Sequence, residues 1–153
     1  MKKIIFASVL GVVILTLGFF LLDRQDNISN QSTLISASFR TSNGLESKVS
    51  NEEGVEIVVI PIDLTADSEF WSFEVSMNTH SVELDQDIMA NSSLEVGDGK
   101  SYNPVVWEGD PVGGHHRSGV LKFKSISPLP SAVAVKIKGI GGASEREFKW
   151  SIK

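Results

Sequence analysis

The chain has 153 residues, enough for one domain and a targeting segment, and its 14 basic and 19 acidic side chains give a formal charge of −5. This charge gives no support for nucleic-acid binding, which requires a basic face. The absence of cysteine excludes disulfide bonds, cysteine nucleophiles, thiolate zinc sites, blue-copper sites and a lipidated cysteine anchor.

Residues 4–22 contain no charged side chain and follow Lys2 and Lys3. As a helix they would span about 28 Å, close to the ~30 Å hydrocarbon core of a bilayer. The run ends in Phe-Phe-Leu-Leu-Asp-Arg, without the small residues that mark a signal-peptidase site. The sequence therefore predicts an uncleaved signal anchor at residues 1–22 of a single-pass membrane protein, with a cytoplasmic N-terminus and the rest of the chain outside the cytoplasm. A cleaved signal peptide is the alternative.

Residues 23–54 are rich in Ser, Asn, Gln and Glu and poor in large apolar side chains, which is typical of a flexible stalk. Within this segment Leu34–Phe39 is a candidate for a short edge strand. We therefore divide the chain into an anchor, a polar stalk at residues 23–54 and a folded domain at residues 55–153.

The folded domain has the pattern of short strands separated by turns. Val55–Leu64 is rich in β-branched residues and contains Pro61, which predicts an edge strand with a bend or bulge. Phe70–Met77 alternates apolar and polar side chains and is the clearest strand. Further strands are predicted at Leu94–Val96, Tyr102–Trp107, Val120–Phe123, Ala132–Ile137 and Phe148–Ile152. This spacing predicts an all-β fold, a single immunoglobulin-like antiparallel β-sandwich behind one N-terminal transmembrane helix.

Charge is unevenly distributed along the chain. Residues 25–112 carry 3 basic and 16 acidic side chains, a net of −13, whereas residues 113–153 carry 8 basic and 2 acidic ones, a net of +6. Because early and late strands interleave in a sandwich, cross-strand pairs can cancel this imbalance. The alternative is a charged face that docks a partner.

All three histidines lie near carboxylates, at the ends of predicted strands. Imidazole and carboxylate groups together suit zinc or copper, and a sandwich can bring two such loops together at one end. Gly113 and Gly114 would allow two neighbouring histidines to converge. The candidate metal ligands are His80, Asp85, Asp87, Glu108, His115 and His116. The alternative is that these side chains brace a long loop through hydrogen bonds and ion pairs.

Three more residues of the segment Trp107–Phe123 are candidates for binding at the loop edge, namely Trp107, Asp110 and Arg117. Trp107 either fills the core between the sheets or stacks on a sugar or peptide at the edge. Asp110 and Arg117 either contact a partner or brace the loop.

The sequence shows no recognisable catalytic arrangement. Ser81 and Ser118 lie near histidines, but there is no Gly-x-Ser-x-Gly segment and no residue order that matches a known triad. Asp85 and Asp87 are typical of a solvated face or of weak calcium ligands. We therefore expect that the protein is not an enzyme.

Three sequence blocks in Val55–Ile152 resemble those of a group of small membrane-anchored prokaryotic β-domains. The blocks are Asn-Thr-His-Ser-Val-Glu-Leu, Tyr-x-Pro-x-x-Trp-Glu-Gly and Gly-Gly-His-His-Arg-Ser-Gly-Val-Leu-x-Phe. The group has no established activity, so the resemblance implies a single exported sandwich and no particular chemistry.

Together these patterns predict a membrane-anchored extracytoplasmic binding module without catalytic activity. In its sharper form, the module binds a divalent transition metal, zinc or copper, through the histidine and carboxylate loops. The alternative is a structural or assembly protein of the cell envelope, which docks a protein partner through a charged face or an open sheet edge. The expected partners are the membrane, through the N-terminal helix, and an envelope protein.

Overall fold

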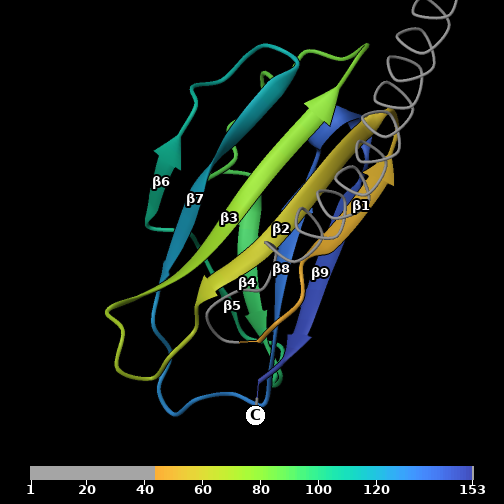
Figure 1. Ribbon diagram of the computed structural model, residues 1–153. Coiled ribbons are helices and arrows are strands. Elements are labelled where there is room, and N and C mark those ends of the chain that lie inside the picture. Colours follow the sequence, from red (N-terminus) through yellow and green to blue (C-terminus); the bar gives the residue numbers. More distant parts are fainter. Residues whose placement is uncertain (1–43, 153) are drawn as a thin grey trace, which may run out of the picture. The chain divides into compact units, whose positions relative to one another are not determined.

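The computed structural model describes residues 44–152, which form two antiparallel β-sheets packed face to face (Figure 1). The prediction of an all-β antiparallel sandwich is confirmed for this part of the chain. The predicted signal anchor, the strand predicted at Leu34–Phe39 and Lys153 lie outside the described residues. Within residues 44–152, no helix is long and apolar enough to cross a membrane.

The larger sheet, called sheet A below, has five strands, and the smaller one, sheet B, has four. The order in sheet A is β1 (Lys48–Glu52), β2 (Val55–Asp63), β3 (Phe70–Thr79), β7 (His116–Lys124) and β6 (Val106–Gly109). The order in sheet B is β5 (Ser101–Tyr102), β4 (Ser92–Val96), β8 (Ala132–Lys138) and β9 (Glu145–Ser151). A single 3₁₀ turn, η1 (Ile140–Gly142), connects β8 to β9.

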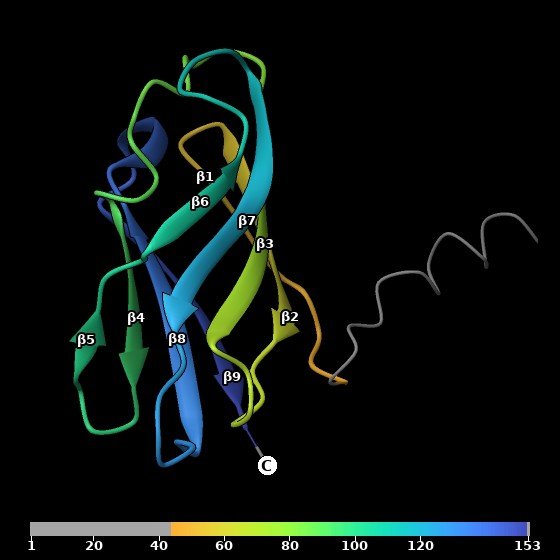
Figure 2. The same ribbon diagram turned by 90° about the vertical axis from the view of Figure 1, so that its left-hand side faces the viewer.

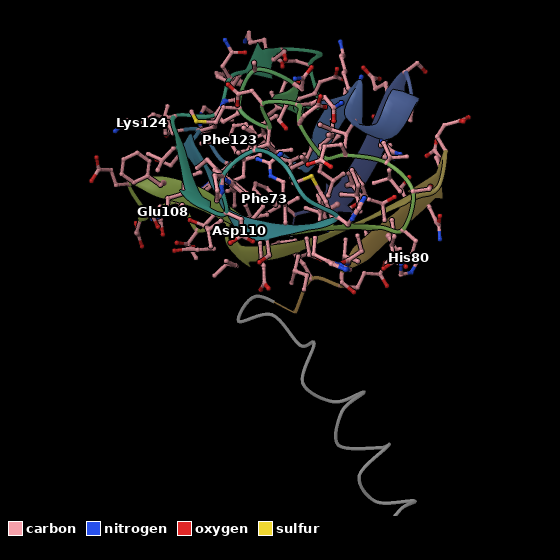
Figure 3. All side chains as sticks on the ribbon, turned by 90° about the horizontal axis from the view of Figure 1, so that it is seen from above. Phe73, His80, Glu108, Asp110, Phe123 and Lys124 are labelled. Carbon is pink, nitrogen blue, oxygen red and sulfur yellow. The ribbon has the colours of Figure 1, made fainter. Side chains whose placement is uncertain are left out.

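The core lies between the sheets and is filled by one face of each long strand. In β3, every second residue from Trp71 to Met77 is fully buried, as the alternation in the sequence predicts. Phe73 packs edge-on against Phe123 of β7 at a centroid distance of 5.8 Å (Figure 3). Its ring is tilted by 39° to that of Trp150 of β9, at a centroid distance of 5.6 Å. Each such side chain contributes about 1.5–3 kcal/mol through burial.

The predicted edge position of the strand at Val55–Leu64 is wrong, because β2 lies second in sheet A, between β1 and β3. The predicted bulge is confirmed between Pro61 and Asp63. Pairing with β1 ends at Lys48 and Val59, so within the described chain Pro61 has a neighbouring strand on one side only. Its missing N–H is therefore tolerated although β2 itself is internal.

β1 lies in the segment that the sequence assigns to the polar stalk. Its residues, Lys-Val-Ser-Asn-Glu, are exposed or only partly buried, so the strand has no apolar alternation by which it could be recognised. The strand forms because β2 offers it a complete antiparallel ladder from Lys48 to Glu52.

The single strand predicted at Tyr102–Trp107 is wrong, because the chain changes sheets within it. β5 pairs with β4 in sheet B, and β6 pairs with β7 in sheet A. Pro104 lies buried in the crossing, where its missing N–H interrupts no ladder. Val105 N then donates to Lys122 O, which brings the chain to sheet A.

Arg146 of β9 is buried, with 1% of its surface exposed, and connects sheet B to sheet A. Its Nη1 donates to Ile140 O at 2.7 Å, and its Nη2 donates to Glu52 O in the β1–β2 turn at 2.8 Å. Burial lowers the pKa of Arg146, and the nearby carboxylates of Glu52 and Glu53 oppose that shift. The guanidinium thus fixes the β1–β2 turn against the opposite sheet.

We expect Arg146→Ala to lower the free energy of unfolding by about 3 kcal/mol, because two hydrogen bonds from a charged donor are lost at a buried site. Urea denaturation measures the change. The control is Lys149→Ala, which removes an exposed cation from the same strand. Equal stability of the two variants would show that Arg146 does not brace the sheets.

Candidate functional site

The segment Trp107–Phe123 forms the β6–β7 hairpin, and its tip is bonded to the loop that follows β3. Gly113 N donates to Leu84 O at 2.8 Å, and Leu84 N donates to Gly114 O at 2.9 Å. Glu83, which was not among the candidate residues, accepts a further hydrogen bond from Gly114 N at 2.6 Å. The two glycines have φ values of 110° and 75°, which side-chain-bearing residues rarely adopt. The structure thus brings together the two loops that hold the histidines.

Arg117 lies on the inner face of β7, with 3% of its surface exposed. Its Nη1 donates to Leu84 O at 3.1 Å and to Gln86 O at 2.8 Å. Burial lowers the pKa of the guanidinium, and the charges of Asp87 and Asp110 oppose that shift. These bonds support the alternative in which Arg117 braces the loop, because the side chain is not exposed to a partner.

The three histidines lie at the same end of sheet A but do not gather around one point. The rings of His80 and His116 have centroids 6.4 Å apart and are nearly perpendicular, at 79°. His116 Nδ1 donates to Asn78 Oδ1 at 2.9 Å. The backbone carbonyl of His115 accepts a hydrogen bond from Thr79 N at 2.9 Å. Two imidazoles are therefore neighbours, and the third contributes its backbone to the loop.

Each candidate carboxylate has a local partner. Asp85 binds the Gln86 amide, Asp87 the Met89 N–H, Glu108 the Lys122 ammonium, and Asp110 the N–H and hydroxyl of Ser118. Figure 3 shows His80 on the opposite side of the sandwich end from Glu108 and Asp110. Within residues 44–152, no group of three or more His, Asp or Glu side chains is arranged to hold a metal ion. The metal site stays a prediction, without an assembled ligand set in this structure.

Trp107 covers a pair of glycines where β6 and β7 come closest. Gly109 and Gly119 face each other across the ladder, and a Cβ on Gly119 would lie 2.5 Å from Gly109 Cα and 2.7 Å from the Trp107 ring. The indole N–H donates to Asp110 O at 2.9 Å. Trp107 is partly buried and packs against the core, so the geometry supports the core-filling alternative. The Trp-Glu-Gly block is thus explained by packing, since an aromatic ring shields glycines near a sheet edge.

β6 is the last strand of sheet A, and in the described part of the chain no strand lies along its outer edge (Figure 2). Asp110 N donates to Ser118 O, so the alternation of an antiparallel ladder directs the backbone groups of Asp110 and Glu108 toward β7. By the same alternation, the N–H and C=O groups of Trp107 and Gly109 point away from the sheet. The sequence suggested Trp107 for its side chain and did not reveal this backbone edge.

Exposed apolar side chains flank the free edge of β6. Val105 precedes the strand with 40% of its surface exposed, and Val112 follows it with 57% exposed. Pro104 and Pro111 bracket the strand, so the edge offers hydrogen bonds over a short length only. The edge is therefore short and partly apolar, with backbone donors and acceptors that point outward.

A hollow of about 470 Å³ lies at the opposite end of the sandwich. Its apolar lining comes from Leu45, Leu64, Leu129 and Ile152, and the other lining residues are Gly44, Thr65, Ala66 and Ser151. Among the described residues, no titratable side chain lines this hollow.

No protein-family model matches the chain. No curated protein and no solved structure matches it either. The resemblance to small membrane-anchored β-domains therefore stays an expectation from the sequence blocks.

We expect Gly119→Ala to lower the free energy of unfolding by about 1–3 kcal/mol, because the new methyl group would overlap backbone atoms of β6. The control is Gly97→Ala, whose Cβ would lie 3.8 Å from Ser131 Oγ, an ordinary contact. Urea denaturation compares the two variants. If they are equally stable, the close approach of β6 and β7 is not required by the fold.

For metal binding, we expect the full-length chain, purified in detergent without a His tag, to retain less than one zinc or copper ion per chain after dialysis. Two neighbouring imidazoles supply only half of a tetrahedral ligand set. Inductively coupled plasma mass spectrometry measures the metal content, with a His80→Ala/His116→Ala variant for comparison. Stoichiometric metal that is lost in the folded variant would support the predicted metal site.

Proposed function

We propose that the chain is a non-catalytic, membrane-anchored docking module of the cell envelope. Residues 1–22 would anchor it, and an immunoglobulin-like sandwich would present the free edge of β6 to a protein partner outside the cytoplasm. The observation that carries the proposal is this edge, with outward-pointing backbone groups at Trp107 and Gly109. An exposed sheet edge binds an extended segment by adding it as a further strand.

Two of the other described edges, those of β5 and β1, are less suited to this role. β5 has only two residues, and its register with β4 covers two pairs. On the β1 side, Trp150 Nε1 donates to Glu46 O at 2.7 Å, and Arg146 donates to Glu52 O, so side chains of sheet B approach the outer strand of sheet A. Among the described strands, β6 thus combines a free edge with flanking apolar side chains.

The partners of the polar side chains favour docking over catalysis. Arg117, Asp110 and Glu83 hold the hairpin tip and its neighbouring loop together through hydrogen bonds. A catalytic group needs a substrate position within hydrogen-bond reach, whereas these side chains point at the protein's own backbone. They give the β6–β7 hairpin a fixed shape, which suits a preformed binding edge.

The predicted topology can be tested with one engineered thiol, because the chain has no cysteine. We expect Lys149→Cys, at an exposed position, to react with a membrane-impermeant maleimide in intact cells or spheroplasts. A control with the cysteine beside Lys3 should react only after lysis. If, in intact cells, the cysteine beside Lys3 reacts and Lys149→Cys does not, the sandwich lies in the cytoplasm.

The docking position can be tested by photo-cross-linking in cells. A photoreactive residue at Val105, beside β6, should form adducts with another protein, because the partner strand would lie against it. The matched control is the same residue at Lys149 on the outer face of sheet B, which should form none. Adducts at Lys149 and not at Val105 would contradict docking at the β6 edge.

A further inference from the structure

We propose that the segment bound by β6 is a short extended strand with an apolar–basic–apolar pattern, whose basic side chain lies opposite Glu108. The inference rests on the proposed function and specifies the chemistry of its partner. It follows from the backbone alternation of β6, from the charge at its centre and from the side chains on its two faces.

The backbone geometry determines which partner residue meets Glu108. Trp107 and Gly109 direct their N–H and C=O groups outward, so an antiparallel strand would bond to both. The partner residue between these two bonded positions would lie directly opposite Glu108. Such pairs have Cβ atoms about 4.5–5.5 Å apart, close enough for their charges to interact.

The negative charge of Glu108 favours a basic residue at the opposite position. It also disfavours a second copy of this chain as the partner. In an antiparallel pair of two β6 strands centred on Glu108, the two carboxylates would face each other, which is unfavourable. The Glu108 side chain is 58% exposed and pairs with Lys122 at 2.7 Å, which leaves room for a second cation. Glu145 shows this arrangement in the same domain, since it lies 3.6 Å from Lys136 and 3.3 Å from Lys138.

The flanking positions would be apolar because of the face they meet. Side chains opposite Trp107 and Gly109 would point to the inner side of sheet A, where the indole lies over the glycine pair. Val105 and Val112, which lie beyond the two ends of the strand, are also apolar and exposed. The prolines at positions 104 and 111 limit the bound segment to about the four residues of β6.

The charge of the whole domain supports a cationic segment. Residues 44–152 carry 17 acidic and 9 basic side chains, a net of −8. Six of the seven lysines in this range are already in ion pairs with carboxylates. The remaining negative field would attract a basic segment and speed its association.

A central charge and bracketing prolines also protect sheet edges against unwanted pairing. The two roles differ in outcome: a protective edge rejects every strand, whereas a docking edge accepts the one with the complementary charge. The test therefore compares probes that differ only in that charge.

The probes are disulfide-closed β-hairpin peptides whose exposed strand is Thr-Val-Lys-Val-Thr or Thr-Val-Glu-Val-Thr. We expect the full-length chain in detergent to bind the lysine peptide about tenfold more tightly than the glutamate peptide, measured by fluorescence anisotropy. N-methylation of either valine next to the lysine should abolish binding, because those N–H groups face β6. N-methylation of the lysine should weaken binding less, because its N–H faces the second strand of the hairpin and not β6.

Glu108→Lys should reverse the preference, so that the glutamate peptide binds more tightly. The matched control is Glu95→Lys, which breaks a comparable ion pair, with Lys136 at 2.8 Å, on the outer face of sheet B and should keep the wild-type preference. Circular dichroism checks that both variants are folded. Binding of neither peptide, or a preference that Glu108→Lys does not change, would overturn the inference.

The two proposals fail in different ways. Cross-linking at Val105 without any charge preference of the peptides would refute the apolar–basic–apolar pattern and leave docking at β6 in place. If Val105 forms no cross-link and the peptides show no charge preference, docking at this edge is refuted as well.

Discussion

Two buried arginines hold the end of the sandwich that carries the histidines. Arg117 of sheet A donates to carbonyls of the loop that leads to sheet B, and Arg146 of sheet B donates to Glu52 O in the turn of sheet A. Arg146 therefore joins the two sheets directly, and Arg117 holds the loop that runs between them. Without these carbonyls, the buried positive charge of each guanidinium would have no hydrogen-bond acceptor, which is energetically costly. The loops that carry the carbonyls are therefore constrained to keep their positions. The shape of the β6–β7 hairpin depends on this constraint, because its tip is bonded to the loop that Arg117 holds.

The same interleaving of strands accounts for the uneven charge along the chain. Basic side chains of the late strands meet acidic side chains of the earlier segments, as in the pairs Lys122–Glu108, Lys124–Glu69 and Lys136–Glu95. These contacts support the alternative in which cross-strand pairs cancel much of the imbalance. Exposed pairs of this kind add little stability, about 0–1 kcal/mol each. Their main effect is on the surface charge. Among residues 44–152 they leave few lysines outside ion pairs and an excess of carboxylates.

Much of the fold could be predicted because apolar and polar residues alternate along a half-buried strand, and this alternation is visible in the sequence. The alternation from Trp71 to Met77 predicts β3, and the alternation at the C-terminus predicts a strand that overlaps β9. Two errors have a common cause. β1 is a polar edge strand that only its ladder with β2 stabilises, and the segment around Pro104 changes sheets without losing its apolar character. The local periodicity of the sequence shows neither feature, because strand pairing joins residues that lie far apart in the chain.

By itself, the sequence determined the class of the domain: all-β, without disulfides, and with a core built from one face of each long strand. It also singled out the segment from Trp107 to Phe123. Only the tertiary structure decided which contacts the side chains of that segment make, because their neighbours come from other strands and loops. Arg117 is buried against the carbonyls of Leu84 and Gln86, Trp107 lies over a glycine pair, and the ring of His80 neighbours that of His116. Topology likewise decided that β6 is an edge strand within residues 44–152, since a strand's sequence does not specify whether both of its sides are paired.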